Sequence, residues 1–271
     1  MRNHTGSSED GNMSFDPGIG VIPVREPLGF RYQPGSFGPR PETRSLDAIR
    51  RSLRDSACSG PDPVYAIVMD VGREEIRPEL ERRMLLFGAV IYASGKLGDE
   101  PVRSQGHVHR ISSHSGWSPP EVYEIWQGSA YIYMQERVAD DPGRCYAILA
   151  KPGDIVVVPP AWAHAAISAD PSDFMAFGAL CDREYGFDYE GIRKRKGLAW
   201  YAIVTPNGAI EWVPNPSYQR TTLSVRGPRD FAELGFVKGS SLYAQAARDL
   251  DRFAWVSHPA RCEEVWRNFE P

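Results

Sequence analysis

Short runs of alternating apolar and polar residues dominate the chain from residue 63 to residue 218. Successive side chains of a β-strand point to opposite faces, so each run predicts a strand with one buried face. Gly, Pro, Asn and Asp residues separate the runs, and the Asn207-Gly208 pair predicts a hairpin. The pattern therefore predicts an all-β domain, folded as a single barrel or double-sheet jelly roll. The expected strands are Val64–Met69, Met84–Ala93, Val102–Val108, Glu121–Gln127, Ala130–Glu136, Cys145–Ala150, Asp154–Val158, Ala163–Ser168, Phe174–Leu180, Ala199–Val204 and Ala209–Val213.

The segments on either side of the barrel have a different texture. Residues 1–20 are small and polar, which predicts a disordered tail, and residues 21–62 form a proline-rich arm. Within that arm, the apolar spacing over residues 44–55 predicts a short helix. After residue 218 the strand pattern stops, and residues 219–271 are expected to be a helical extension, with helices at Pro228–Leu234 and Leu242–Phe253.

Composition narrows the classes of partner. The net charge of -4 gives no reason to expect nucleic acid or an anionic membrane as partner. No apolar run has the length of a membrane span, and the start of the chain lacks the apolar core of a secretory signal. The cysteines contain no C-x-x-C pair and are expected to be reduced thiols of a cytoplasmic protein: Cys58, Cys145, Cys181 and Cys262.

Four side chains form a candidate metal site. His107 and His109 are one residue apart, so they share one face of a strand, and Glu121 and His164 follow later in the chain. Three imidazoles and one carboxylate suit a divalent transition metal such as Fe, Mn, Ni or Zn. The alternative is a set of hydrogen-bonded histidines without a metal. Glu124 is expected on the opposite face from Glu121, as a surface or salt-bridge residue.

These residues resemble the cupin superfamily. His107-Val108-His109 followed by Glu121 and Gly128 resembles the first cupin motif, and Gly153, Pro159 and His164 resemble the second. Departures are Ala161, where the second motif has Gly, and Ser168, where it has Asn. A lengthened segment, Arg110–Pro120, also separates His109 from Glu121. It includes His114, which we interpret as a loop residue, with a pocket lid as the alternative.

Within the cupins, the sequence is similar to the cupin-type phosphoglucose isomerases across residues 63–218. The resemblance runs through Gly106-His107-Val108-His109, Glu121-Val122-Tyr123, Val158-Pro159-Pro160-Ala161-Trp162-Ala163-His164 and Gly186-Phe187-Asp188-Tyr189. It implies that His107, His109, Glu121 and His164 hold the metal, and that Ser104, Gly106, Tyr123 and Tyr185 bind substrate. It further implies catalytic roles for Glu121 and Tyr189. For the charge of the phosphate we expect Lys96 or Arg103.

The implied activity is a metal-dependent interconversion of glucose 6-phosphate and fructose 6-phosphate, with Fe2+ favoured and Mn2+, Ni2+ or Zn2+ as alternatives. The sequence does not choose between an enediol and a hydride-shift mechanism. Exposed sheet edges and the proline-rich arm suggest a homodimer. Three positions depart from the family: Phe187 replaces a His, Leu180 a Tyr and Ala89 a Thr. These losses keep two other hypotheses open, an Fe(II) oxygenase or lyase acting on another small molecule, and a binding cupin without turnover.

Overall fold

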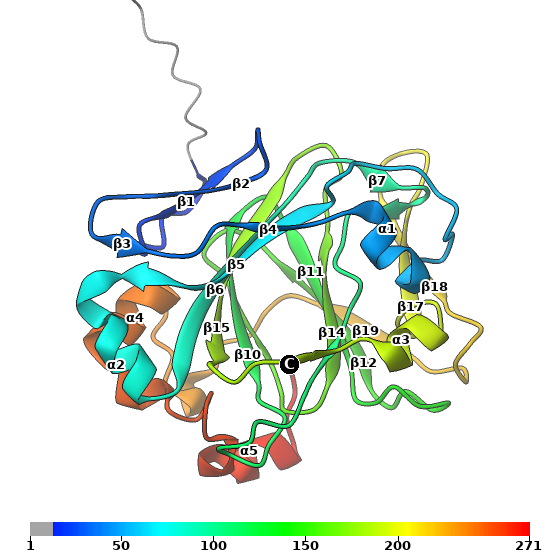
Figure 1. Cartoon of the computed structure of the whole chain (residues 1–271). Helices are drawn as coiled ribbons and strands as arrows, with labels where there is room; N and C mark the ends of the chain where they lie inside the picture. The colour runs from blue at the N-terminus through cyan, green and yellow to red at the C-terminus, as the bar shows by residue number, and fades with distance from the viewer. Residues whose placement is uncertain (1–12) are drawn as a thin grey trace, which may run out of the picture.

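Two β-sheets face one another and enclose the interior of a barrel (Figure 1). The computed structural model describes residues 13–271. The first twelve positions of the expected disordered tail, residues 1–12, lie outside the described residues. The strands run antiparallel in nearly every pair. The prediction of an all-β, single-barrel jelly roll is confirmed.

The larger sheet contains seven strands and forms one wall of the barrel. Its order is β13-β10-β15-β6-β5-β3, with β4 also paired to β5. The register of β15 against β6 is unbroken over the whole length of the pair, which makes this the most regular part of the wall. The strands are β3 Ser36–Phe37, β4 Glu42–Arg44, β5 Tyr65–Arg73, β6 Leu85–Tyr92, β10 Glu121–Gln127, β13 Ile155–Val158 and β15 Met175–Asp182.

The smaller sheet contains four strands in the order β14-β11-β12-β19. Three of them were expected: β11 Ala130–Gln135, β12 Cys145–Ala150 and β14 Ala163–Ser168. The fourth, β19 Leu223–Arg226, lies in the expected helical extension and pairs parallel with β12. It corrects the prediction that strands end before residue 219. Four short pairs complete the fold: β1 Val21–Val24 with β2 Gly29–Tyr32, β7 Lys96–Leu97 with β8 Glu100–Pro101, β9 Val108–His109 with β16 Phe187–Asp188, and β17 Trp200–Val204 with β18 Ile210–Pro214.

Helices are short and lie outside the barrel (Figure 1). The helix expected at residues 44–55 appears as α1 Leu46–Ile49, which continues as the 3-10 helix η1 Arg50–Ser52. Its apolar side chains Leu46 and Ile49 are buried against the barrel, as the spacing predicted. The other helices are η2 Glu74–Ile76, α2 Arg77–Arg82, α3 Glu190–Lys194, η3 Ala232–Leu234, α4 Leu242–Arg248, η4 Leu250–Phe253, η5 Pro259–Cys262 and α5 Glu263–Arg267.

The larger sheet is buried on both faces. Its inner face packs against the smaller sheet, whereas its outer face is covered by the C-terminal helices, drawn in orange and red in Figure 1. Glu124 points to this outer face, away from Glu121 as predicted. The expectation that it lies at the surface is wrong, because it is 2% exposed and accepts hydrogen bonds from Leu242 N and Trp126 Nε1. The C-terminal helix α4 covers it, and the sequence pattern of β10 alone gives no sign of that cover.

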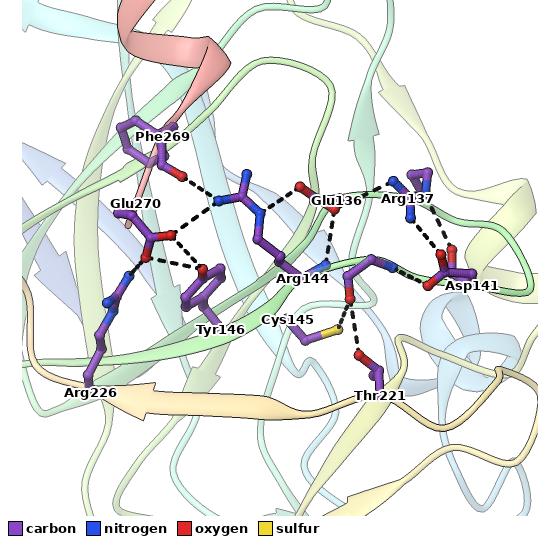
Figure 2. A network of polar contacts seen from close by, with 11 residues as sticks. Glu136, Arg137, Asp141, Arg144, Cys145, Tyr146, Thr221, Arg226, Phe269 and Glu270 are labelled. Carbon is purple, nitrogen blue, oxygen red and sulfur yellow. Dashed lines mark hydrogen bonds and ion pairs between the residues drawn. The ribbon is translucent and has the colours of Figure 1, made fainter.

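Both ends of the described chain are fixed to the barrel. Residues 13–20 differ from the disordered tail that the sequence predicts, because Phe15 N donates to Trp126 O at 3.1 Å and Ile19 is fully buried. At the other end, the carboxylate of Glu270 accepts from Arg226 at 2.8 Å and from Arg144 and Tyr146 at 3.2 Å (Figure 2). The last residues therefore bind the smaller sheet where β12 pairs with β19. Among residues 13–271, no helix has the length and apolar character that crossing a membrane requires.

Candidate functional site

Four side chains with metal-binding atoms meet inside the barrel. His109 lies on β9, and His107 directly precedes that strand and forms a bridge with His164. Glu121 is the first residue of β10 in the larger sheet, and His164 lies on β14 in the smaller one. Their ligand atoms all lie within 4.8 Å of one another. The fold thus brings together the four residues that the sequence singled out.

The orientation of two imidazoles is set by backbone carbonyl groups. Nδ1 of His109 lies 2.9 Å from Pro119 O, and Nδ1 of His164 lies 3.0 Å from Trp162 O. A carbonyl oxygen only accepts, so each Nδ1 carries a proton, and each Nε2 points toward the carboxylate of Glu121. This is the arrangement that metal-binding histidines adopt, because it fixes the ring and leaves the donor nitrogen free.

The cluster also leaves buried nitrogen atoms that a metal would satisfy. Among the described residues, Nε2 of His107 and Nε2 of His109 are buried and have no hydrogen-bond partner. They face Glu121 Oε2 at 3.9 and 3.3 Å, and His164 Nε2 lies 3.0 Å from the same oxygen. A buried polar atom without a partner is costly. The three nitrogen atoms and one carboxylate oxygen can hold a divalent transition metal.

The charge states of Glu121 and His107 match those of metal ligands. Burial alone would raise the pKa of Glu121, but the imidazoles of His109 and His164 outweigh it and hold that pKa well below its usual range. Burial, followed by the neighbouring His164 and His109, lowers the pKa of His107 well below its ordinary value. Glu121 is therefore ionised and His107 neutral near pH 7, and metal binding requires both states.

Two further side chains hold the carboxylate of Glu121. The hydroxyl of Tyr123 donates to Oε2 at 2.7 Å, and the thiol of Cys181 lies 3.3 Å from Oε1. Both are on the same inner face of the larger sheet, since Tyr123 follows two residues after Glu121 on β10 and Cys181 lies on the neighbouring β15. Each carboxylate oxygen thus has a defined direction in the site.

A small cavity of about 50 Å³ opens beside this cluster. One part of its lining carries hydroxyl, amide and imidazole groups, and another part is apolar. The lining residues are Tyr65, Ile67, Met69, Gly88, Val90, Tyr92, Ser104, Gln105, Gly106, His107, Glu121, Tyr123, Ala166, Phe177, Ala179, Phe187 and Tyr189.

The cavity includes most of the residues that the sequence selected for substrate. Ser104, Gly106, Tyr123 and Tyr189 all line it. Tyr185 stands apart, because its ring packs on Phe187 at 5.4 Å between centroids, outside the lining. It precedes β16 and belongs to a small apolar cluster at the end of β15. Its closeness to Phe187 in the sequence therefore does not place it in the cavity lining.

The backbone explains one match with the family pattern and one departure from it. Gly106 has φ +82°, and a Cβ there would lie 3.1 Å from Leu198 and 3.4 Å from His164 O, so glycine suits this position. Ala161 adopts φ +68°, the left-handed conformation that the Gly of the second cupin motif favours. The turn before His164 therefore keeps its shape although Ala replaces Gly.

Two of the substitutions noted in the sequence lie outside the cavity. Leu180 and Ala89 point to the outer face of the larger sheet and pack under the C-terminal helices. The inward positions on the same strands are Cys181, next to Glu121, and Gly88 and Val90, which line the cavity. Side chains alternate between the two faces of a strand. An error of one residue in matching this chain to the family pattern therefore assigns a side chain to the opposite face. Of the three departures, only Phe187 is in the cavity lining.

One positive charge near the cavity belongs to a residue that the sequence did not reveal. Arg193 Nε donates to Gln105 Oε1 at 3.0 Å, and its guanidinium lies 5.0 Å from the ring centroid of Tyr189. The expectation for Lys96 and Arg103 is wrong: Lys96 is exposed on β7, and Arg103 forms a buried ion pair with Glu100 at 2.8 Å. Strand alternation could have found Tyr65 and Tyr92 on β5 and β6. Arg193, on helix α3, gives no such signal.

The sequence comparisons with known proteins identify one family. A sequence model described as "Glucose-6-phosphate isomerase (GPI)" matches residues 45–219. The glucose-6-phosphate isomerase of Thermococcus gammatolerans is 28% identical over 172 residues, which cover 64% of this chain and 79% of the relative. That of Thermococcus litoralis is 31% identical over 158 residues, 58% of this chain and 74% of the relative. Among solved structures, a recombinant oxalate oxidase in complex with glycolate aligns with a TM-score of 0.37 at 13% identity, covering 51% of this chain and 61% of that one.

Proposed function

The chain belongs to the glucose-6-phosphate isomerase family, and we propose that it interconverts glucose 6-phosphate and fructose 6-phosphate through a divalent metal. The proposed ligands are His107, His109, Glu121 and His164. One observation carries the proposal: in a member of that family, the four ligand atoms lie within 4.8 Å of one another, and two of the ligands, His107 and Glu121, line a cavity.

The reaction moves a hydrogen between C1 and C2 of the sugar. A divalent metal, when bound, supplies Lewis acidity that polarises the carbonyl group and stabilises developing negative charge. In the enediol mechanism, the ionised carboxylate of Glu121 accepts the proton from one carbon and returns it to the other. Burial raises the pKa of Tyr189, so its hydroxyl stays protonated and donates a hydrogen bond to a sugar oxygen. In a hydride shift, the same residues position the two carbons.

Hydrogen-bond donors of the cavity would bind the phosphate. Ser104 Oγ accepts from Ala166 N at 3.2 Å, which leaves its own proton for a ligand oxygen, and the amide of Gly106 lies nearby in the lining. Because Arg193 occupies Oε1 of Gln105, the amide nitrogen of Gln105 remains available as a further donor. We assign the phosphate to these donors, with Arg193 supplying positive charge.

The metal, the compartment and the assembly are further parts of the proposal. We favour Fe2+, with Mn2+, Ni2+ and Zn2+ as alternatives, since all accept mixed imidazole and carboxylate ligands. A cytoplasmic location is supported by Cys58, Cys145, Cys181 and Cys262, which are free thiols; fractionation of cells tests it. A homodimer is supported by the open edges of β13 and β14 in the described sheets. Equilibrium sedimentation that gives only the chain mass of 30.3 kDa would contradict the dimer.

The direct test is isomerase activity after metal loading. Metal-free protein is supplied with Fe2+, Mn2+, Ni2+ or Zn2+, and fructose 6-phosphate formed from glucose 6-phosphate is measured. We expect turnover with at least one metal. The His109→Ala variant should lose at least about 100-fold in kcat/KM, since even residues that only orient a metal ligand cost 10- to 100-fold. Glu211→Gln, at an exposed position of strand β18 outside the ligand cluster, is the control.

A second candidate function, oxygen activation or lyase chemistry on a less polar molecule, is favoured by Phe187. Its ring lies 4.4 Å from that of His107 between centroids, so an apolar wall borders the ligand cluster. The same metal-loaded samples are therefore monitored for oxygen uptake. Isomerase turnover without oxygen uptake supports our proposal, and absence of isomerase turnover with every metal rejects it.

A further inference from the structure

The lengthened segment between His109 and Glu121, residues 110–120, joins the metal ligands to the wall of the cavity. We propose that this 110–120 loop is a clasp in which Glu184 and His114 act as positioning residues for His109 and Phe187. The inference rests on the metal site of the proposed function. It assigns a role to a segment that lies outside the cavity and holds none of the ligands.

The first contact of the clasp is made by the carboxylate of Glu184, which lies outside the 110–120 loop and accepts hydrogen bonds from it. Glu184 Oε2 accepts from Ser113 Oγ at 2.7 Å and Ser113 N at 2.8 Å, and from Ser112 Oγ at 3.1 Å and His114 N at 3.2 Å. A single carboxylate oxygen thus gathers two hydroxyl and two amide donors from three consecutive residues. Hydrogen bonds to an ionised acceptor are stronger than neutral ones, so this contact fixes the first half of the loop.

A second contact joins the loop to the end of β15. His114 Nε2 lies 2.9 Å from Asp182 Oδ2, and Asp182 is fully buried. The other oxygen of Asp182 accepts from Glu184 N at 2.7 Å, which sets the direction of the Glu184 backbone. Asp182 and Glu184 lie within five residues before Phe187 in the sequence. Their contacts therefore connect the 110–120 loop to the segment that contributes Phe187 to the cavity wall.

The far end of the loop reaches the metal ligand itself. Ser118 Oγ donates to His109 O at 2.7 Å, and Pro119 O accepts from His109 Nδ1 at 2.9 Å. On its other side His109 pairs with Phe187 between β9 and β16, and Arg110 N donates to Gly186 O at 2.7 Å. His109 is therefore held between the loop and the 182–187 segment, and the contacts of Glu184 and His114 keep these two elements together.

Releasing the clasp should weaken both the metal site and the substrate site. Without Glu184, the loop loses its shared acceptor, and the carbonyl of Pro119 no longer has a fixed position for the His109 ring. Partners that orient a ligand typically contribute a factor of 10 to 100 in metal affinity. Phe187 lies in the cavity wall, so its displacement should raise KM more than it lowers kcat.

The test compares Glu184→Ala with Glu184→Gln. Ala removes the acceptor, whereas Gln keeps an oxygen for the Ser113 and His114 amides. Binding of Mn2+ and of Zn2+ to metal-free protein is measured by calorimetry. We expect Glu184→Ala to weaken metal binding about 10-fold and Glu184→Gln to recover most of it. Nitrogen NMR of the His109 imidazole should show loss of the fixed Nδ1 proton only in the Ala variant.

The outcomes separate the clasp from the metal site as such. Wild-type protein that binds neither metal contradicts the proposed function. Wild-type binding with unchanged affinity, KM and His109 signals in Glu184→Ala overturns the clasp, even if amide exchange in residues 110–120 becomes faster. His114→Ala provides a second variant if Glu184→Ala fails to fold, because its side chain is partly exposed at 17%. It should weaken metal binding in the same direction.

Discussion

The guanidinium of Arg193 shows how one side chain acts on the site from outside the cavity. It sits over Tyr189 at 5.0 Å, hydrogen-bonds Gln105 and pairs with Glu190 at 3.1 Å. Its neutral partner Gln105 is 3% exposed, whereas its acidic partner lies at the surface. The charge is therefore directed toward the cavity through an uncharged amide. This arrangement suits an anionic substrate, because the arginine is not neutralised on its inner side.

Replacing Arg193 should affect substrate binding more than turnover. We expect Arg193→Met to raise KM for glucose 6-phosphate about 10-fold with a smaller change in kcat, since the charge acts on ground state and transition state alike. Arg195→Met is the matched control: Arg195 lies 4.8 Å from the ring of Tyr218, far from the lining, and pairs with Asp140. Steady-state kinetics of the two variants decide the matter. An equal rise of KM in both would count against a specific role.

At the same scale, sequence reasoning found side chains whose chemistry is rare and missed those whose role depends on packing. His107, His109, Glu121 and His164 stand out because three imidazoles and a carboxylate share a recognisable spacing. Tyr185 was placed too near the cavity. Arg193 was missed because it is one of many charged residues on short helices. Only the folded structure shows that its guanidinium lies over the ring of Tyr189.

Strand β10 illustrates how an element can serve two environments. Its inward residues Glu121 and Tyr123 line the cavity, and Glu121 also belongs to the ligand cluster. Its outward residues Val122 and Glu124 lie beneath the C-terminal helices. Alternation predicts the two faces, but not that both are buried. The cover over Glu124 comes from residues more than a hundred positions later in the chain, and no local pattern carries that information.

The buried carboxyl of Glu124 should make stability depend on pH. Burial raises its pKa to about 7, and the hydrogen bonds from Leu242 N and Trp126 Nε1 offset only part of that rise. A carboxyl with a raised folded pKa favours the folded state when protonated, so its contribution is present below about pH 4.5 and is lost as the pH rises through about 7. The free energy of unfolding should fall by roughly 2–3 kcal/mol on this account between pH 5 and pH 8.

Urea unfolding of Glu124→Gln at pH 5 and pH 8 checks this expectation. Glutamine cannot ionise, so the variant should gain stability relative to the wild type as the pH rises. Glu211→Gln, at an exposed position of strand β18, should keep the wild-type dependence. A difference between wild type and Glu124→Gln that is the same at both pH values would contradict the assignment.

On the scale of the whole molecule, the barrel is wrapped by segments from both ends of the described chain. The C-terminal residues 229–271 supply Phe231, Phe253 and Phe269 to the outer apolar cluster of the larger sheet. Phe269 is 1% exposed and stacks on Phe231 with ring centroids 5.9 Å apart. Next to it, Glu270 forms the ion-pair network of Figure 2 at the smaller sheet. The tail thus contacts both walls of the barrel.

These two neighbours should contribute very differently to stability. Phe269→Ala removes a buried aromatic ring and should lower the free energy of unfolding by about 3–5 kcal/mol. Glu270→Gln weakens ion pairs that are roughly half exposed, which contribute about 1 kcal/mol or less. Thermal and urea unfolding of the two variants measure the contrast. Similar losses in both would indicate that the network, and not the aromatic packing, anchors the tail.

The overall architecture was predictable to the extent that it depends on local alternation. Eight of the eleven expected strands appear in the two sheets, because period-two patterns specify a strand with one face toward the interior. The other two strands that form, β17 and β18, pair separately, and the expected strand Val102–Val108 is wrong, because Arg103 and His107 make only isolated bridges there. Strand β19 was not predictable, since its pairing with β12 is parallel and joins residues about 78 positions apart. The packing of residues 13–20 was missed for a similar reason, because the polar residues among them hide the buried Pro17, Ile19 and Gly20.

The late position of the C-terminal cover has a consequence during biosynthesis. The ribosome makes the barrel strands of the larger sheet before residues 229–271, so the apolar outer face of that sheet, including Trp126 and Phe87, is complete before its cover exists. An exposed apolar surface on a partly made chain attracts other chains and molecular chaperones. Ribosome-bound or prematurely terminated chains that lack this segment should therefore aggregate or be held by chaperones, even though they contain every ligand of the metal cluster.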